Sequence, residues 1–183
     1  FSQVHKIIAF AGREHHVTRL NGIVSALQSG DREVRFLICD NSVNIDPSSA
    51  HMYRNNVPFM HALDFLPTNG VETSAQMARS VLQRMEGQIL DRVDPFWISS
   101  SVREACENLV CFASMLEVEK PSLILILHEN NFWTRQLAYL CAEFKIPCVS
   151  FQEGLLRLRD ETTQGKQGIA ADYSTKLLVW SEA

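Results

Sequence analysis

Three clusters of polar residues in this sequence carry side chains that could bind a polar ligand or move a proton. They lie at residues 12–16, 128–131 and 152–154. Imidazole and carboxylate groups can act as general bases when their pKa values lie near the working pH. Glycine allows a ligand to approach the backbone closely, and carboxamides and arginine supply hydrogen bonds. The clusters therefore indicate a ligand site with a candidate base.

Two roles are assigned within these clusters. We interpret His15, His16 and Glu129 as the candidate catalytic bases. The candidates for substrate binding are Gly12, Arg13, His128, Asn130, Asn131, Gln152, Glu153 and Gly154. A helix that begins near Asn131 would also offer free N–H groups to an anion. A second interpretation stays open, in which the histidines are solvated or capping residues and one of the two asparagines is an N-cap.

The spacing of residues excludes several classes of site. The loop after the first apolar run has one glycine, Gly12, whereas a dinucleotide-binding turn needs three. No Gly-x-x-x-x-Gly-Lys-Ser/Thr pattern occurs, which excludes a phosphate-loop NTPase. The five cysteines show no Cys-x-x-Cys spacing and lie in apolar runs, so we expect buried free thiols and no metal site. No cofactor is assigned.

The elements that must position these clusters follow from an alternation of short apolar runs with helical patterns. Strands are expected at residues 6–10, 34–39, 57–62, 123–127, 148–151 and 177–180. Residues 123–127 (LILIL) are apolar at every position, which is typical of a central strand buried on both faces of a parallel sheet.

Helical spacing of apolar residues fills the intervals between these strands. It runs from Val17 to Leu27 and from Met77 to Ile89, and again from Trp133 to Phe144. Asp94-Pro95 is interpreted as a break after the second helix, and the capping-box pattern Ser101-Val-Arg-Glu104 as the start of the next. The Met77 and Met85 stripe, like that of Trp133 and Phe144, is interpreted as a core-facing surface.

The alternation predicts a three-layer, Rossmann-like α/β domain with a mostly parallel sheet of about six strands. Such sheets bind ligands beyond the carboxyl ends of their strands, close to the point where the strand order reverses. Each polar cluster directly follows a predicted strand. We therefore expect all three to lie on one rim of the sheet.

Composition is that of a globular protein without a nucleic-acid partner. The 183 residues are 46% hydrophobic and 21% charged, with a formal net charge of −4. They fit one domain, residues 1–183. No apolar stretch is long enough for a transmembrane segment and no signal peptide is recognised, so we expect a cytoplasmic protein.

A family resemblance rests on the last third of the sequence. The segment KPSLILILHENNFWTRQLAYLCAEFKIPCVSFQEG, followed by AADYSTKLLVWSE, resembles the N-terminal Rossmann-like domain of GT-B glycosyltransferases. The group includes capsule and teichoic-acid polymerases and the related UDP-GlcNAc 2-epimerases. Its members have a Gln/His-Gly step, an Ala-Asp pair and a Trp-Gly or Trp-Ser strand end. The corresponding residues here are Gln152-Glu153-Gly154, Ala171-Asp172 and Trp180-Ser181, and Glu153 departs from the histidine of many relatives.

The resemblance implies the N-terminal half of a two-domain GT-B protein. Such a domain would bind a sugar or glycan acceptor, and a missing C-terminal domain would bind the nucleotide-sugar donor. It implies transfer of a sugar or polyol phosphate, and no activity for the isolated domain. Two alternatives stay open, namely a stand-alone small-molecule or protein-binding module without catalysis, and the N-terminal half of a sugar-nucleotide 2-epimerase.

Overall fold

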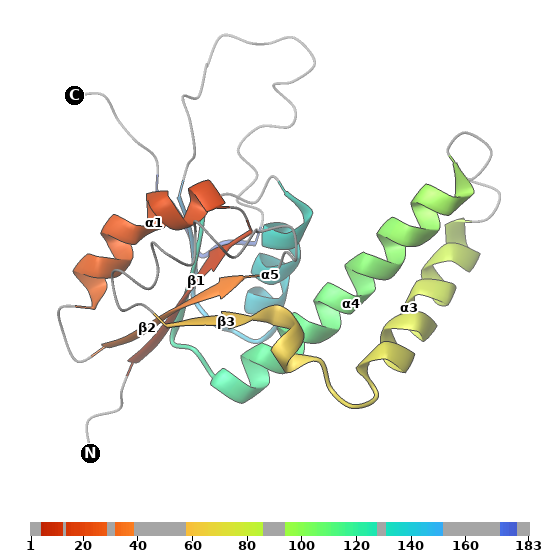
Figure 1. Cartoon of the computed structure of the whole chain (residues 1–183), viewed down its shortest axis with the longest axis horizontal. Helices are drawn as coiled ribbons and strands as arrows, with labels where there is room; N and C mark the ends of the chain where they lie inside the picture. The colour runs from red at the N-terminus through yellow and green to blue at the C-terminus, as the bar shows by residue number, and fades with distance from the viewer. Residues whose placement is uncertain are drawn as a thin grey trace, which may run out of the picture.

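The computed structural model describes residues 5–12, 14–28, 32–38, 58–85, 94–127, 131–151 and 173–178. Within them a six-stranded sheet has the order β3-β2-β1-β4-β5-β6, and every strand pairing is parallel (Figure 1). The strands are β1 (His5–Ala11), β2 (Arg32–Ile38), β3 (Phe59–His61), β4 (Leu123–Ile126), β5 (Cys148–Phe151) and β6 (Lys176–Leu178). The predicted fold class, a parallel Rossmann-like α/β sheet, is confirmed.

Helices cover both faces of this sheet. They are α1 (Glu14–Leu27), the short 3₁₀ helix η1 (Ala62–Phe65), α3 (Gly70–Met85), α4 (Pro95–Glu119) and α5 (Phe132–Glu143). Helix α1 packs on one face, and α4 and α5 pack on the other, which gives three layers. In Figure 1, α3 lies alongside α4, and the pair projects away from the sheet.

Alternation along the strands divides the core in two. On β1, Ile8 and Phe10 point toward α4 and α5, where Phe10 meets Phe112 edge-to-face with ring centroids 5.8 Å apart. Ile7 and Ala9 point the other way, toward Leu20 and its neighbours on α1. A strand inside such a sandwich must be apolar on both sides, which accounts for the unbroken apolar runs.

The LILIL run behaves as expected over most of its length. Residues 124–127 are buried, and the most exposed of them, Leu127, has an exposed fraction of 4%. Leu123 at the start of β4 is half-buried. Strand β1 is buried over five consecutive residues, so β4 shares the centre of the sheet with β1 and is not more buried than it.

The start of α4 differs from the sequence prediction. Asp94-Pro95 does lie at the boundary between the two helices, but the interpretation of Ser101 as a helix start is wrong, because α4 begins at Pro95 and residues 101–104 lie inside it. The Asp94 carboxylate accepts a hydrogen bond from the Phe96 backbone N–H at 2.9 Å. Proline suits the first helical position because an N–H there would have no partner within the helix.

The apolar stripe of α3 also differs from expectation. Met77 is 38% exposed, and the buried residues of this helix are the small Gly70, Ser74 and Ala78. Phe144, the C-cap residue of α5, was also predicted to face the core but is 38% exposed. Trp133, at the start of the same helix, is partly buried against the core. Periodicity identified the presence of the helices, but it showed neither where α4 begins nor which apolar faces are covered.

The predicted buried thiols are present. Cys106, Cys111, Cys141 and Cys148 are free and buried, and Cys39 lies outside the described residues. A hydrogen bond in which the Cys141 S–H donates to Cys148, together with burial, raises the pKa of the Cys141 thiol. Burial and the charge of Glu107 raise the pKa of Cys111 to about 11. No described helix is long and apolar enough to cross a membrane.

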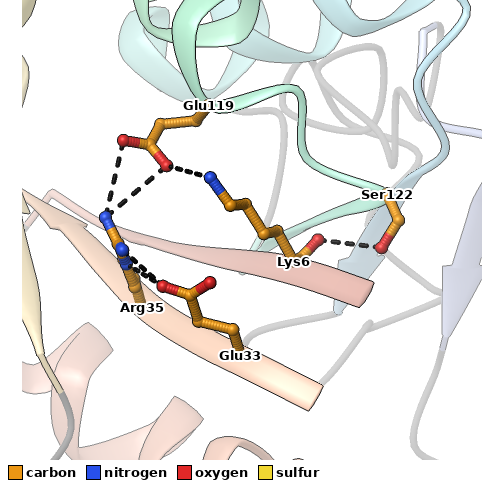
Figure 2. Close-up of polar contacts among 5 residues, drawn as sticks. All are labelled: Lys6, Glu33, Arg35, Glu119 and Ser122. Carbon is orange, nitrogen blue, oxygen red and sulfur yellow. Dashed lines mark hydrogen bonds and ion pairs between the residues drawn. The ribbon is translucent and has the colours of Figure 1, made fainter. Parts of the chain in front are cut away.

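A charge network fastens the end of α4 to the sheet (Figure 2). The Glu119 carboxylate accepts a hydrogen bond from Lys6 Nζ on β1 at 3.1 Å and lies 3.4 Å from an Arg35 guanidinium nitrogen on β2. Glu33 pairs with the other side of Arg35, its carboxylate accepting from Arg35 Nε at 2.7 Å. The Ser122 hydroxyl donates to the Lys6 carbonyl at 2.8 Å. These contacts join α4, β1, β2 and the start of β4 at the amino end of the sheet.

Replacing Glu119 with alanine should lower the free energy of unfolding by about 1–3 kcal/mol, since two cations lose a half-buried partner. Urea unfolding measures the effect. The matched control is Glu117→Ala, an exposed carboxylate on the same helix, for which we expect a change within about 0.5 kcal/mol. Equal effects of the two substitutions would show that the network does not stabilise the fold.

Candidate functional site

The strand order places a topological switch point between β1 and β4. The chain proceeds outward from β1 through β2 to β3, and then returns to the other side of β1 to form β4. Helix α1, which follows β1, and helix α5, which follows β4, pack on opposite faces of the sheet, so the carboxyl ends of these two strands mark the switch point. Ligands of open α/β sheets bind in this place.

The strands that precede the three polar clusters are neighbours in the sheet. β4 pairs with both β1 and β5, and all three are parallel, so Ala11, Ile126 and Phe151 end at the same edge. Seven of the candidate residues themselves lie outside the described part of the chain: Arg13, His128, Glu129, Asn130, Gln152, Glu153 and Gly154. His15 belongs to α1, but its side chain is likewise not described. Their common rim stays a prediction, supported by the strands that lead into them.

His16 lies in the first turn of α1 and is buried. Its exposed fraction is 2%, and the adjacent Val17 has 1%. A general base must come within hydrogen-bond reach of the proton that it removes. The burial of this ring excludes the interpretation of His16 as a solvated residue and argues against the role of a base, whereas the capping interpretation stays open.

Asn131 is the N-cap of α5. Its side-chain oxygen accepts hydrogen bonds from the Thr134 backbone N–H and from the Thr134 hydroxyl, both at 2.9 Å. The Thr134 hydroxyl is also 3.1 Å from the Asn131 carbonyl oxygen, and Thr134 is fully buried. The capping interpretation is thereby confirmed for Asn131. Its side-chain oxygen is used by the helix cap, and the cap fixes where α5 begins after β4.

Gly12 supplies space for aromatic packing at the switch point. A Cβ atom at this position would lie 3.2 Å from Phe10 Cε1 and 3.3 Å from Trp133 Cε3. The absence of a side chain thus lets the indole of α5 close against the end of β1. In a dinucleotide-binding turn a phosphate approaches the glycine backbone, whereas here the protein's own aromatic rings occupy that space.

The substitution Gly12→Ala should lower the free energy of unfolding by about 1–3 kcal/mol, because the added methyl group overpacks the Phe10 and Trp133 contact. Thermal unfolding of the variant measures the loss. Gly22→Ala is the matched control, since a Cβ there meets nothing within 4 Å and alanine favours the α1 helix. A Gly12→Ala variant as stable as the Gly22→Ala variant would contradict the packing role.

Sequence reasoning missed one residue at the same edge, His61 at the end of β3. Its Nδ1 accepts a hydrogen bond from the Leu63 backbone N–H at 3.1 Å, and Asp64 accepts from the His61 backbone N–H at 3.0 Å. Because Nδ1 is the acceptor, the neutral ring carries its proton on Nε2. The His-x-x-Asp spacing was the available signal, since an acid three residues after a capping residue marks a helix start.

The described residues do not group into a metal site. No set of three His, Cys, Asp or Glu side chains among them is placed to hold an ion. Three features lie at the described part of this edge. They are the contact of Trp133 with Gly12, the capped start of α5, and His61 on β3, which is two strands away from β1. This arrangement can form the wall of a ligand crevice, and the proton-transfer groups would come from the predicted clusters.

Comparison with known proteins shows similarity in structure alone. No protein-family model and no curated protein sequence matches the chain. The UDP-GlcNAc 2-epimerase of Neisseria meningitidis, solved bound to UDP-GlcNAc, superimposes with a TM-score of 0.56 at 12% identity, over 90% of this chain and 36% of that one. The Methanocaldococcus jannaschii UDP-GlcNAc 2-epimerase gives 0.55 at 14% identity, over 98% and 40%. A further UDP-N-acetylglucosamine 2-epimerase gives 0.59 at 10% identity, over 97% and 42%.

The chain therefore spans about two fifths of the length of the epimerases that it resembles. Identities of 10–14% do not establish a shared activity. The superpositions, which cover at least 90% of this chain, show that it shares the Rossmann-like fold of one part of these enzymes.

Proposed function

We propose that the chain is the acceptor-side domain of a GT-B glycosyltransferase. In this proposal the crevice between β1 and β4 binds a sugar or glycan acceptor, and a base from its rim takes the proton of the acceptor hydroxyl. His15 and Glu129 are the first candidates for that base, because the ring of His16 is buried. The reaction transfers a sugar or polyol phosphate from a nucleotide-activated donor.

One observation carries the proposal more than any other. The strands leading into the three polar clusters are β1, β4 and β5, which are adjacent and parallel at the switch point. This order supports the prediction that chemistry-bearing residues distant in sequence share one edge, the edge where this architecture binds ligands. The likeness to sugar-nucleotide enzymes over at least 90% of the chain supports the assignment of ligand class.

A second domain, outside this sequence, would hold the donor. The chain corresponds to 36–42% of the length of the epimerases that it resembles, which leaves room there for a further domain. A crevice at a domain boundary would exclude water from the reacting groups once both domains close. The isolated chain is accordingly expected to be inactive.

A second candidate function is one half of a sugar-nucleotide 2-epimerase. The observation that favours it is the identity of the structural neighbours, which are UDP-GlcNAc 2-epimerases. The two reactions differ in their need for a second substrate, because an epimerase changes the sugar nucleotide alone and a transferase also needs an acceptor.

The test uses the full-length protein and a panel of UDP- and CDP-activated donors, followed by ³¹P and ¹H NMR. Release of a free nucleotide that depends on added glycan or polyol acceptors would support the transferase. Conversion of UDP-GlcNAc to a stereoisomer without any acceptor would overturn it in favour of the epimerase. Calorimetric binding of a ligand with no turnover of any donor would instead support the binding module.

A further inference from the structure

The outward face of α5 carries a row of aromatic and cationic side chains. Phe132, Arg135 and Tyr139 follow one another at intervals of three and four residues, a spacing that puts them on one face of a helix. The other face of α5 carries its buried residues, which are Thr134, Leu137, Ala138 and Cys141. Phe132 is 40% exposed and Tyr139 is 43% exposed. The row therefore presents its rings to solvent and not to the core.

Tyr173 joins this row from a distant part of the sequence. Its ring packs edge-to-face with that of Tyr139, and the ring centroids are 5.4 Å apart. The Arg135 guanidinium lies over the Tyr173 ring, 5.9 Å from its centroid. Tyr173 is 37% exposed in this arrangement. We define the α5 track as Phe132, Arg135, Tyr139 and Tyr173.

Hydrogen bonds hold both ends of the α5 track in place. The Thr175 backbone N–H donates to the Cys148 carbonyl at 2.8 Å, and the Cys148 N–H donates to the Thr175 hydroxyl at 3.1 Å, which fixes the segment that carries Tyr173. At the other end, the N-cap Asn131 fixes the first turn of α5, which carries Phe132. Because these segments are ordered in advance, little conformational freedom is lost when a ligand binds.

The α5 track begins beside the edge of the sheet where the ligand site is predicted. Phe132 packs against Trp133, with ring centroids 5.6 Å apart, and Trp133 in turn closes against Gly12 at the end of β1. Phe132 and Tyr139 are seven residues apart, about 10 Å along a helix. Since α5 runs from the end of β4 to the start of β5, the track leads away from that edge over more than the length of one sugar ring.

The chemistry of the α5 track fits a chain of ring sugars. The face of an aromatic ring is electron-rich, so it attracts the weakly positive C–H groups on the flat side of a sugar ring. Tyrosine hydroxyls and a guanidinium can form hydrogen bonds with sugar hydroxyl groups. A linear polyol phosphate has no flat apolar side, and its phosphates would favour a cluster of cations over three rings and one arginine.

The exposed area of the track is too small for a protein partner. A covered aromatic side chain buries about 150–250 Å², so three rings that are about two fifths exposed offer roughly 250 Å². A stable protein interface takes about 800 Å² from each partner. A narrow ligand that follows the helix needs far less area than this.

We propose that the α5 track is a subsite for a chain of ring sugars, occupied by the part of a glycan acceptor that lies beyond the reacting unit. The inference rests on the proposed function for its link to an acceptor, and it narrows the substrate class to sugar chains over polyol phosphate chains. Binding of such a chain can be measured without any transfer reaction, so the two proposals can fail separately.

The first experiment is isothermal titration calorimetry on the full-length protein. The probes are glucose and N-acetylglucosamine, their β-linked oligosaccharides, and oligomers of glycerol phosphate. We expect the oligosaccharides to bind at least about tenfold more tightly than the single sugars, because each further ring contact adds favourable free energy. Absence of binding by every oligosaccharide would overturn the proposal, and so would tighter binding of the glycerol phosphate oligomers.

The second experiment compares variants of the track. Tyr139→Ala should weaken oligosaccharide binding about tenfold, since an apolar ring contact is lost, whereas Tyr139→Phe keeps the ring and should keep most of the affinity. Phe144→Ala is the matched control, because this C-cap residue of α5 is 38% exposed and lies outside the track. Thermal unfolding checks that each variant is folded. Equal affinities of the folded Tyr139→Ala and Phe144→Ala variants would show that the track is not a subsite.

The third experiment locates the ligand by ¹⁹F NMR of the full-length protein labelled with fluorotyrosine. The Tyr139 and Tyr173 resonances, assigned from the Tyr139→Phe and Tyr173→Phe variants, should move when the oligosaccharide is added. Binding that moves neither resonance would place the sugar chain elsewhere and overturn the proposal. A changed oligomeric state of Tyr139→Ala, without any oligosaccharide binding to the unsubstituted protein, would overturn it in favour of a protein interface.

Discussion

Replacing Phe112 with alanine should lower the free energy of unfolding by about 3–5 kcal/mol, the largest loss of stability that we expect from a single substitution. Phe112 is fully buried on α4, and its ring packs edge-to-face with the ring of Phe10 on the central strand β1. Removing the ring leaves a cavity between α4 and β1 that the packed surroundings cannot fill. Chemical denaturation with urea, followed by circular dichroism, measures the change.

A loss of this size is a large part of the stability of an ordinary domain, so the variant should also be partly unfolded near body temperature. Val118→Ala on the same helix is the control, since that side chain is 64% exposed and its truncation should change stability by about 0.5 kcal/mol or less. If the Phe112→Ala variant is as stable as this control, the Phe112 side chain does not contribute to the core between α4 and β1.

The largest effect on activity is expected from Glu129→Gln in the full-length protein. Glutamine keeps the size and the hydrogen-bonding oxygen of glutamate but cannot take a proton at neutral pH, so turnover should fall at least about a hundredfold. Single-turnover kinetics with the donor and acceptor identified by NMR would measure it. A small change in KM beside a large change in kcat would identify a base and not a binding group.

Glu117→Gln is the activity control, because this exposed carboxylate lies in the last turns of α4, near the amino end of the sheet. It should keep normal turnover. If the Glu129→Gln variant is folded and equally active, Glu129 is not the base, and the same measurement on His15→Gln decides the other candidate.

The central strands could be predicted because their burial demands a continuous apolar pattern. Residues 123–127 and 148–151 stand between helix and turn signals, and both became strands within one residue of the expected bounds. A parallel sheet requires helical crossovers, so the number of layers followed as well. Local composition and global fold agree at these places.

Helix boundaries were less predictable where one signal has two meanings. Proline can mark the end of the preceding helix or the first residue of the following one. Pro95 is the first residue of α4. A capping-box pattern inside a long helix, as at residues 101–104, carries no boundary because its N–H groups already have partners in the preceding turn. The choice depends on packing against the sheet, which no local pattern reports.

The strands that lead into the candidate site were predictable, but the packing beside their ends was not. Topology alone assigns the ends of β1, β4 and β5 to one edge. It does not show that the Gly12 space is filled by Trp133, because the two residues come together only through the packing of α5. Burial of His16 likewise depends on the orientation of α1 about its own axis when it packs against β1. The spacing of apolar residues shows which face of the helix is apolar, but not how far the residues beside that face are buried.

The brevity of β3 bears on how the molecule avoids misassembly. This edge strand has three residues, Phe59–His61, preceded by Pro58, which has no N–H, and followed directly by η1. An exposed edge is a template onto which a strand of another molecule can add, and the ordered stacking of such strands leads to fibrils. Here the chain turns away after three residues, so an incoming strand would find too few free backbone groups to be held. A substitution that extended β3 past His61 would remove this protection while leaving the interior of the sheet unchanged.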